Sequence, residues 1–459
     1  MIQLAESMSR TLLLMRDEFG PDIDDSVLLS ALTNTRVALI ADTTNIASYA
    51  AQTAFVTTAM LMARSGHQVF LMAPDVEMTG PQPPLEPGTI IDQLTRVGKD
   101  ILPGIEFTVG KPEDDVDLAI GLGDSHLDVR ARMRIRLNAE PWVGYIAPEN
   151  ELRRWQATLW PFGALAAAGL GAGEAFKAAM NKLLPYALNS ENTAERFAFT
   201  DQASFELAPS GTPFCRDLGE IDFVSGGAIT NAILYCLARI PGVTSQGRII
   251  EPDNAELTNL NRYMLLLRSR VNASKALDLV QMLGEGLHFQ PLLERYDARL
   301  HERIAPLSST VVVGVDDIPT RWLVQEAKPD WLLIAATGHW SAMVSFHSEG
   351  FACARCLHDR DDPIDGPIPT TACVSFWAGL LAAAYFARHA IGEVISVNEQ
   401  QQVYISPFRP ESVFFSGVAF RNDCPTCQPT WRVPFSSAKT AGSFPTRPPQ
   451  NSTLPKQRD

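Results

Sequence analysis

The chain has 459 residues, of which 46% are hydrophobic and 20% are charged, and its formal net charge is -14. This is a globular composition, long enough for two or three domains, and its acidic balance argues against nucleic acid or an anionic membrane as a partner. The longest apolar run, residues 376–387, is shorter than the ~20 residues that cross a bilayer, and we expect no signal peptide. We therefore expect a cytoplasmic protein.

The first half of the chain alternates strand-like and helix-like segments. Continuous apolar runs, typical of strands buried on both faces of a parallel sheet, occupy residues 35–42, 68–75, 116–124 and 140–149. Helix-like segments occupy residues 46–66 and 163–184. Strands that alternate with helices predict an α/β fold with a doubly wound parallel sheet.

The same order recurs in the second half. Strand-like runs occupy residues 220–227, 246–253, 309–317 and 330–338. Helix-like segments occupy residues 230–240 and 378–392. The small-residue helix that closes each half favours a duplication, although any two α/β domains look alike at this level of detail. We predict a first domain at residues 1–205, a linker at 206–219 and a second domain at 220–430. Residues 431–459 are predicted to form a disordered tail.

Four of the seven cysteines form two CxxC pairs, Cys353 with Cys356 and Cys424 with Cys427. A tetrahedral zinc site takes four soft ligands, and two such pairs supply four thiolates. The sequence therefore predicts one Zn²⁺ that joins distant parts of the chain. The alternative is a redox pair or two unrelated turns.

A turn that could approach a phosphate follows the strand that ends at Val224. Nucleotide-binding turns of this type have the pattern G-x-G-x-x-G, in which glycines let backbone approach phosphate. Here Ser225 and Thr230 occupy the outer positions, and Gly227 keeps the central one. Glu251, at the end of the next strand, is the acid expected to hold ribose hydroxyls. This pattern alone fits a nicotinamide dehydrogenase equally well.

The stretch EPDNAELTNLNR, residues 251–262, distinguishes these possibilities. It resembles the signature of the ThiF/MoeB/ubiquitin-activating (adenylating) superfamily, with Lys275 at the matching distance beyond Arg262. A second family motif is matched by DDIPTR, which begins at Asp316 and ends at Arg321. Paired CxxC motifs belong to the same family pattern. The resemblance implies two tandem Rossmann-like halves of the ThiF type, the first inactive and the second active.

The resemblance also implies ATP and Mg²⁺ as cofactors. Such a site works mainly by positioning and by preorganised positive charge. Arg262 and Lys275 are expected on the phosphates and Asp316 on Mg²⁺. The complete set of expected nucleotide ligands is Gly227, Glu251, Asp253, Asn259, Arg262, Lys275 and Asp316. The alternative for Arg262 is a salt bridge to Asp253 or Glu256 on a solvated face.

The first half is expected to support this site from outside. Its turn at residues 40–48 contains no glycine and is not expected to cradle phosphate. Arg10, in the stretch MSRTLLL, matches an arginine that family members send from the partner half into the active site. Arg10 could instead decorate an N-terminal helix, and Arg16 is a weaker rival for the same role.

Family members that form thioesters place a catalytic cysteine in a crossover loop, here at about residues 350–375. Cys373 is the cysteine in that position, and a thiolate is an ordinary nucleophile for an activated acyl group. The alternative is that Cys373 packs in the closing helix as a small hydrophobe.

The resemblance is greatest to activating enzymes of bacterial ubiquitin-like conjugation (Bil-type antiphage) operons. It implies ATP-dependent adenylation of a ubiquitin-like protein, thioester formation, and transfer to a ubiquitin-conjugating-like enzyme. A second possibility is a MoeB/ThiF-like adenylyltransferase for a sulfur carrier or small peptide without a thioester. A third is a degenerate scaffold without catalysis. The two halves on one chain would form a pseudo-dimer.

Overall fold

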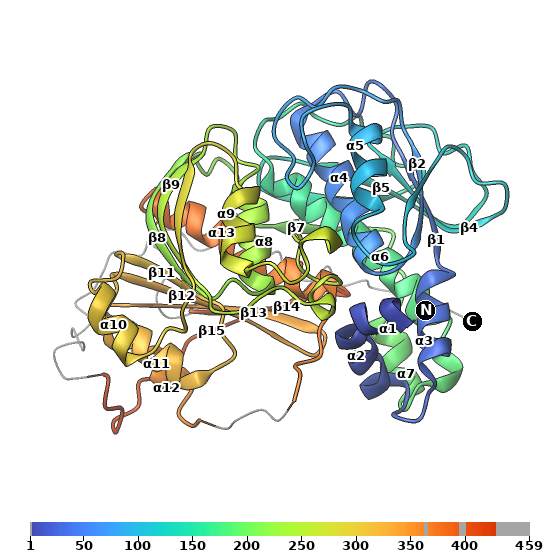
Figure 1. The fold of residues 1–459 in the computed structure, drawn as a ribbon. Helices are drawn as coiled ribbons and strands as arrows, with labels where there is room; N and C mark the ends of the chain where they lie inside the picture. The colour runs from blue at the N-terminus through green and yellow to red at the C-terminus, as the bar shows by residue number, and fades with distance from the viewer. Residues whose placement is uncertain (1, 362–365, 394–400, 428–459) are drawn as a thin grey trace, which may run out of the picture.

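The computed structural model describes residues 2–361, 366–393 and 401–427 (Figure 1). The predicted disordered tail at 431–459 lies outside the described residues, as does part of the predicted crossover loop, 362–365.

The first half contains a seven-stranded sheet in the order β3-β2-β1-β4-β5-β6-β7. Pairing is parallel as far as β5, and β6 and β7 run antiparallel. The strands are β1 (Arg36–Ile40), β2 (Gln68–Met72), β3 (Phe107–Val109), β4 (Val116–Leu122), β5 (Ala131–Ala139), β6 (Val143–Pro148) and β7 (Ala203–Glu206).

The second half repeats this topology strand for strand in the order β10-β9-β8-β11-β12-β13-β14, and adds β15 at the edge. Its pairing also changes from parallel to antiparallel after the fifth strand in the series. The strands are β8 (Asp217–Val224), β9 (Thr244–Ile250), β10 (Leu287–Leu292), β11 (Thr310–Val313), β12 (Trp331–Gly338), β13 (Ser341–Ser348), β14 (Gln402–Ser406) and β15 (Arg409–Ser416). The α/β fold class with two parallel-sheet halves is confirmed, and each sheet ends in antiparallel strands at one edge.

Four helices pack together where the halves meet (Figure 1). They are α4 (Tyr49–Arg64), α6 (Phe162–Asn181), α8 (Ala228–Leu237) and α13 (Ala372–Ala390), and each is buried on nearly all sides. Gly379 allows close contact, since a Cβ there would lie 2.4 Å from the Cβ of Ala232. Apolar sequence on every face of these helices thus reflects an internal interface between the halves.

The other helices lie around this core. They are α1 (Ile2–Ser7), α2 (Ser9–Phe19), α3 (Asp25–Thr33), α5 (Ile90–Gly98), α7 (Ser190–Arg196), α9 (Lys275–Met282), α10 (Ala298–Ile304), α11 (Ile318–Glu326) and α12 (Ala354–Leu357). Short 3₁₀ turns occur at η1 (Leu184–Tyr186), η2 (Leu257–Asn259) and η3 (Arg268–Arg270). Within the described ranges, no helix combines the length and apolar character needed to span a bilayer.

Candidate functional site

A cavity of about 370 Å³ opens at the carboxyl ends of β8, β9 and β11. Strand order reverses there, because β9 lies on one side of β8 and β11 on the other, and open α/β sheets bind ligands at such points. The cavity brings together most of the predicted nucleotide ligands and Arg10 from the first half. Its walls include Arg10, Gly227, Glu251, Asp253, Arg262, Lys275 and Asp316.

The turn between β8 and α8 is shaped by a buried carboxylate. Ser225 has φ 111°, a left-handed conformation that favours glycine, which explains why the family pattern has glycine there. Its hydroxyl accepts a hydrogen bond from the Gly227 backbone N–H at 2.9 Å. Glu251 accepts from the N–H groups of Gly226 at 2.7 Å and Asp253 at 3.0 Å. Glu251 therefore holds the turn as well as lining the cavity.

Two arginines face the cavity without a carboxylate partner. Arg262 donates to the Thr258 carbonyl and to Asn261 Oδ1 at 3.0 Å, and Arg10 donates to the Ile368 carbonyl at 3.5 Å. Neither forms an ion pair within the part of the chain that the structure describes. The alternative salt bridges of Arg262 to Asp253 or Glu256 are therefore not observed.

Neither arginine is neutralised by an ion pair with a described residue. Arg262 is 7% exposed, and burial lowers its pKa. The Arg10 charge acts in the same direction, whereas Tyr263, Asp316 and Glu256 act in the opposite direction. Buried cations of this kind are costly unless an anion neutralises them, so this part of the cavity is suited to a negatively charged ligand.

The two arginines predicted for the same role, Arg10 and Arg16, lie in different environments. Arg10 lies on α2 and lines the cavity, whereas Arg16, near the end of the same helix, pairs with Asp25. The chain passing over the cavity is also held by α2, because Thr11 donates to the Thr370 carbonyl at 3.4 Å. The first half therefore supplies Arg10, not Arg16, to the cavity.

Lys275 is the first residue of α9 and donates to Asp253 Oδ2 at 3.1 Å. Burial opposes the charged form, but Tyr263 and Glu251 raise the pKa of Lys275 above its ordinary value. Lys275 is therefore a cation at the wall, already neutralised in part by carboxylates.

Asp316 lies in the turn after β11 and accepts no hydrogen bond from any described residue. Partial burial raises the pKa of Asp316, while Arg321 and Arg262 act in the opposite direction. Arg321 points away from the cavity and holds the turn, since its Nε and one Nη donate to the Val315 carbonyl at 3.0 and 2.8 Å. The Asp316 carboxylate is thus positioned yet available to a cation.

Two predicted site residues are not at the cavity wall. Asn259 is buried and its side chain accepts from the Glu256 N–H at 2.9 Å, closing the cap of η2. Cys373 is the second residue of α13 and is 0% exposed. Burial raises its pKa to about 12, and a hydrogen bond with Ser65 offsets only part of this rise. In this conformation Cys373 is a packed thiol, as the alternative interpretation predicts.

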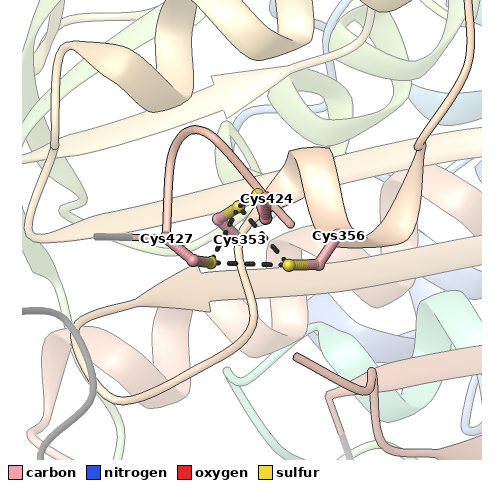
Figure 2. Close-up of side chains that lie close together, drawn as sticks. All are labelled: Cys353, Cys356, Cys424 and Cys427. Carbon is pink, nitrogen blue, oxygen red and sulfur yellow. Dashed lines mark hydrogen bonds between the residues drawn. The ribbon is translucent and has the colours of Figure 1, made fainter. Parts of the chain in front are cut away.

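The predicted zinc ligands lie together (Figure 2). Cys353, Cys356, Cys424 and Cys427 have sulfur atoms within 4.8 Å of one another, with individual separations from 3.2 to 3.9 Å. Zn–S bonds of about 2.3 Å in a tetrahedron place sulfurs roughly 3.8 Å apart. The Arg421 N–H donates to Cys356 Sγ at 3.4 Å, a contact that suits a thiolate. The four cysteines fit zinc in number, chemistry and spacing.

Several cavity residues were not predicted. Tyr263 comes directly after the quoted stretch 251–262, and this buried residue lines the same cavity. Arg295, Tyr296 and Ser375 come from segments without a recognised motif. The one signal in the sequence was adjacency to Arg262, which could have indicated Tyr263 but not the other three residues.

The corresponding turn of the first half is closed by acidic and amide side chains. Asn45 donates to Asp42 at 3.1 Å and to Asp124 at 2.7 Å, and it accepts from the Trp155 N–H at 2.9 Å. A Cβ at Gly123 would lie 2.1 Å from the Asn45 side chain. In this turn, therefore, an amide side chain bridges two carboxylates.

Comparisons with known proteins agree with these motifs. Residues 36–194 match the model of the BilD N-terminal domain family. Over 206 residues the chain is 28% identical to protein y4jF of Sinorhizobium fredii, covering 44% of this chain and 39% of the relative. Over 249 residues it is 26% identical to the sulfur carrier protein adenylyltransferase of Thermus thermophilus, covering 50% of this chain and 89% of the relative.

Among solved structures, E. coli MccB with succinimide is similar with a TM-score of 0.38 and 14% identity, over 64% of this chain and 98% of MccB. PaaA is similar with a TM-score of 0.36 and 14% identity, over 44% of this chain and 73% of PaaA. The sequence comparisons confirm the predicted resemblance to the ThiF/MoeB-like adenylating superfamily.

Proposed function

We propose that the chain adenylates the C-terminal carboxylate of a ubiquitin-like protein, using ATP and Mg²⁺. The observation that carries this proposal is the presence of Arg10 and Arg262 in one cavity without a carboxylate partner in the described chain. The superfamily and the matched BilD N-terminal domain model support adenylation as the chemistry.

In this proposal the N-terminus of α8, Arg262 and Lys275 bind the triphosphate, and Asp316 holds Mg²⁺. Glu251 orients the turn and the ribose. A carboxylate oxygen of the protein substrate forms a bond to the α-phosphorus, while the bond to the bridging β-phosphate oxygen breaks and pyrophosphate leaves with the electron pair. Because the attacking group is already an anion, the chain's contribution is positioning and positive charge.

In the second proposed step the Cys373 thiolate attacks the acyl carbon of the adenylate, a thioester forms as the bond to the AMP oxygen breaks, and AMP leaves. The acyl group is then transferred to a thiol of a conjugating enzyme, and the Cys373 thiolate is released. Cys373 is buried beside Ser65, so this step requires the start of α13 to move away from α4. A second candidate function, adenylation of a sulfur carrier or peptide without a thioester, is favoured by this burial and by the sulfur carrier adenylyltransferase among the relatives.

The test is ATP–pyrophosphate exchange by the full chain with bacterial ubiquitin-like proteins that end in glycine. The matched control is each protein with its C-terminal carboxylate amidated. We expect exchange with at least one free carboxylate and none with its amide. The absence of exchange with every free carboxylate would contradict adenylation and favour the scaffold.

Non-reducing electrophoresis separates the two candidate functions. A dithiothreitol-sensitive adduct that disappears in Cys373→Ala supports the thioester step. Exchange without an adduct, or an adduct that persists in Cys373→Ala, contradicts the role of Cys373 and favours the second candidate.

A further inference from the structure

Arg64, the last residue of α4 in the first half, reaches across the interface into the second half. Its side chain is fully buried. One Nη donates to the Leu260 carbonyl at 2.6 Å, and the other donates to the carbonyls of Met264 at 3.1 Å and Leu266 at 2.8 Å. One guanidinium therefore ties both ends of the segment 260–266.

The segment 260–266 carries part of the cavity wall. Arg262 and Tyr263 lie within it and line the cavity. The second half fixes the segment through a donor, because the Leu265 N–H donates to Asn231 Oδ1 on α8 at 2.6 Å. Arg64 holds the same segment by donating to three of its backbone carbonyl groups. The orientation of Arg262 thus depends on contacts from both halves.

The chemistry of this contact is specific to arginine. Burial lowers the pKa of Arg64 to about 9, so its guanidinium is charged at neutral pH. No carboxylate of the described chain forms an ion pair with it, and three carbonyl dipoles surround the charge instead. A planar fork satisfies several such acceptors at once, whereas a lysine ammonium is a point charge that cannot span them.

We propose that Arg64 is a positioning residue, which acts through the segment 260–266 to aim Arg262 and Tyr263 into the cavity. This inference rests on the proposed function in so far as Arg262 is taken to bind phosphate. It assigns to the first half a second contribution to the site, distinct from that of Arg10, which faces the cavity itself.

Arg239 provides a matched control. It is also a fully buried arginine at the interface between the halves, and it donates to the carbonyls of Tyr235 at 2.9 Å and Pro83 at 2.7 Å. In the described structure, none of its hydrogen bonds is with the segment 260–266. Arg239→Lys therefore measures what loss of a buried interfacial guanidinium does without disturbing that segment.

The test compares Arg64→Lys with Arg239→Lys in the full chain. Hydrogen–deuterium exchange without nucleotide is expected to accelerate in peptides covering 260–266 for Arg64→Lys only. Calorimetric titration with MgATP is expected to give a Kd about 10-fold weaker for Arg64→Lys and changed less than about 2-fold for Arg239→Lys. If Arg64→Lys does not fold, Arg64→Gln, which keeps a planar donor without charge, replaces it.

A double-mutant cycle decides whether Arg64 acts through Arg262. In an Arg262→Ala background, Arg64→Lys is expected to change the MgATP Kd less than about 2-fold further. Equal exchange in both lysine variants, or fully additive losses in the cycle, would overturn the proposal. Failure of the unsubstituted chain to bind MgATP would instead contradict the proposed function, and the exchange comparison would still decide whether Arg64 holds the segment.

Discussion

The turns after β1 and β8 occupy the same place in two sheets of matching topology, yet different side chains surround them. After β8, the backbone turns at Ser225 and Gly227 and opens on a cavity with two arginines that form no ion pair with a described residue. After β1, Asn45 fills the turn and bridges the carboxylates of Asp42 and Asp124. A fold therefore fixes where a site can lie, while a few side chains decide whether an anion can enter it.

The largest difference expected between the halves concerns metal. The only cysteine cluster found among the described residues belongs to the second half. We expect about one zinc per chain by mass spectrometry, and Cys356→Ser is expected to remove it and to lower the free energy of unfolding by several kcal/mol. Hydrogen exchange should accelerate around residues 352–357 and not in the first sheet. Full occupancy of zinc in Cys356→Ser would contradict the assignment.

Carboxylates in the two turns should respond differently to substitution. Asp316→Ala is expected to lower ATP–pyrophosphate exchange by about 10²–10³-fold, because it removes the proposed Mg²⁺ ligand while Arg321 still holds the turn. Asp124→Asn in the first half should leave exchange within about 2-fold of the unsubstituted chain. Circular dichroism checks that both variants are folded. Equal losses in the two variants would remove the distinction between the halves.

The fall of MgATP affinity at acidic pH tests the role of Asp316. Burial raises the pKa of Asp316, so its carboxylate protonates as pH falls at a higher pH than for an ordinary aspartate. Since only the ionised form binds Mg²⁺, the MgATP affinity should fall over that range. When calorimetry is repeated with ATP in EDTA, without Mg²⁺, the ATP affinity should not fall over this pH range. An identical fall without Mg²⁺ would show that another group titrates.

The smallest expected effect concerns the backbone of the turn after β8. Ser225→Ala keeps the left-handed φ of 111° and loses the hydrogen bond from the Gly227 N–H, whereas Ser225→Gly relieves the strain. Ser225→Gly is therefore expected to be more stable than Ser225→Ala by roughly 1–2 kcal/mol. Urea unfolding measures the difference. The reverse order would show that the turn is not strained.

Much of the site followed from sequence because its residues lie at fixed distances from strand ends. Glu251, Lys275 and Asp316 follow strands or begin a helix, and parallel strands bring those positions to one edge. Asn259, also expected as a nucleotide ligand, does not line the cavity, since spacing locates a segment but not which side chain of a tight turn faces the ligand.

Contacts between the halves could not be predicted. Arg64 lies in a helix whose every face is buried, and nothing in its local sequence separates it from Arg239. Whether Cys373 is exposed depends on where α13 begins. Thr371 caps this helix, and Cys373 is its second residue. The antiparallel strands β13 to β15 were also missed, because a sheet edge carries a weaker apolar pattern than a central strand.

The tandem arrangement has a consequence for stoichiometry. Arg10 reaches a cavity that belongs to the other half of its own polypeptide, whereas Asn45 bridges two carboxylates at the corresponding turn of the first half. A symmetric pair of identical subunits would hold two nucleotides and would have to preserve both turns. Under the proposed function, joining the two copies in one polypeptide would leave a single nucleotide for each chain, and would free the other turn to diverge without loss of turnover.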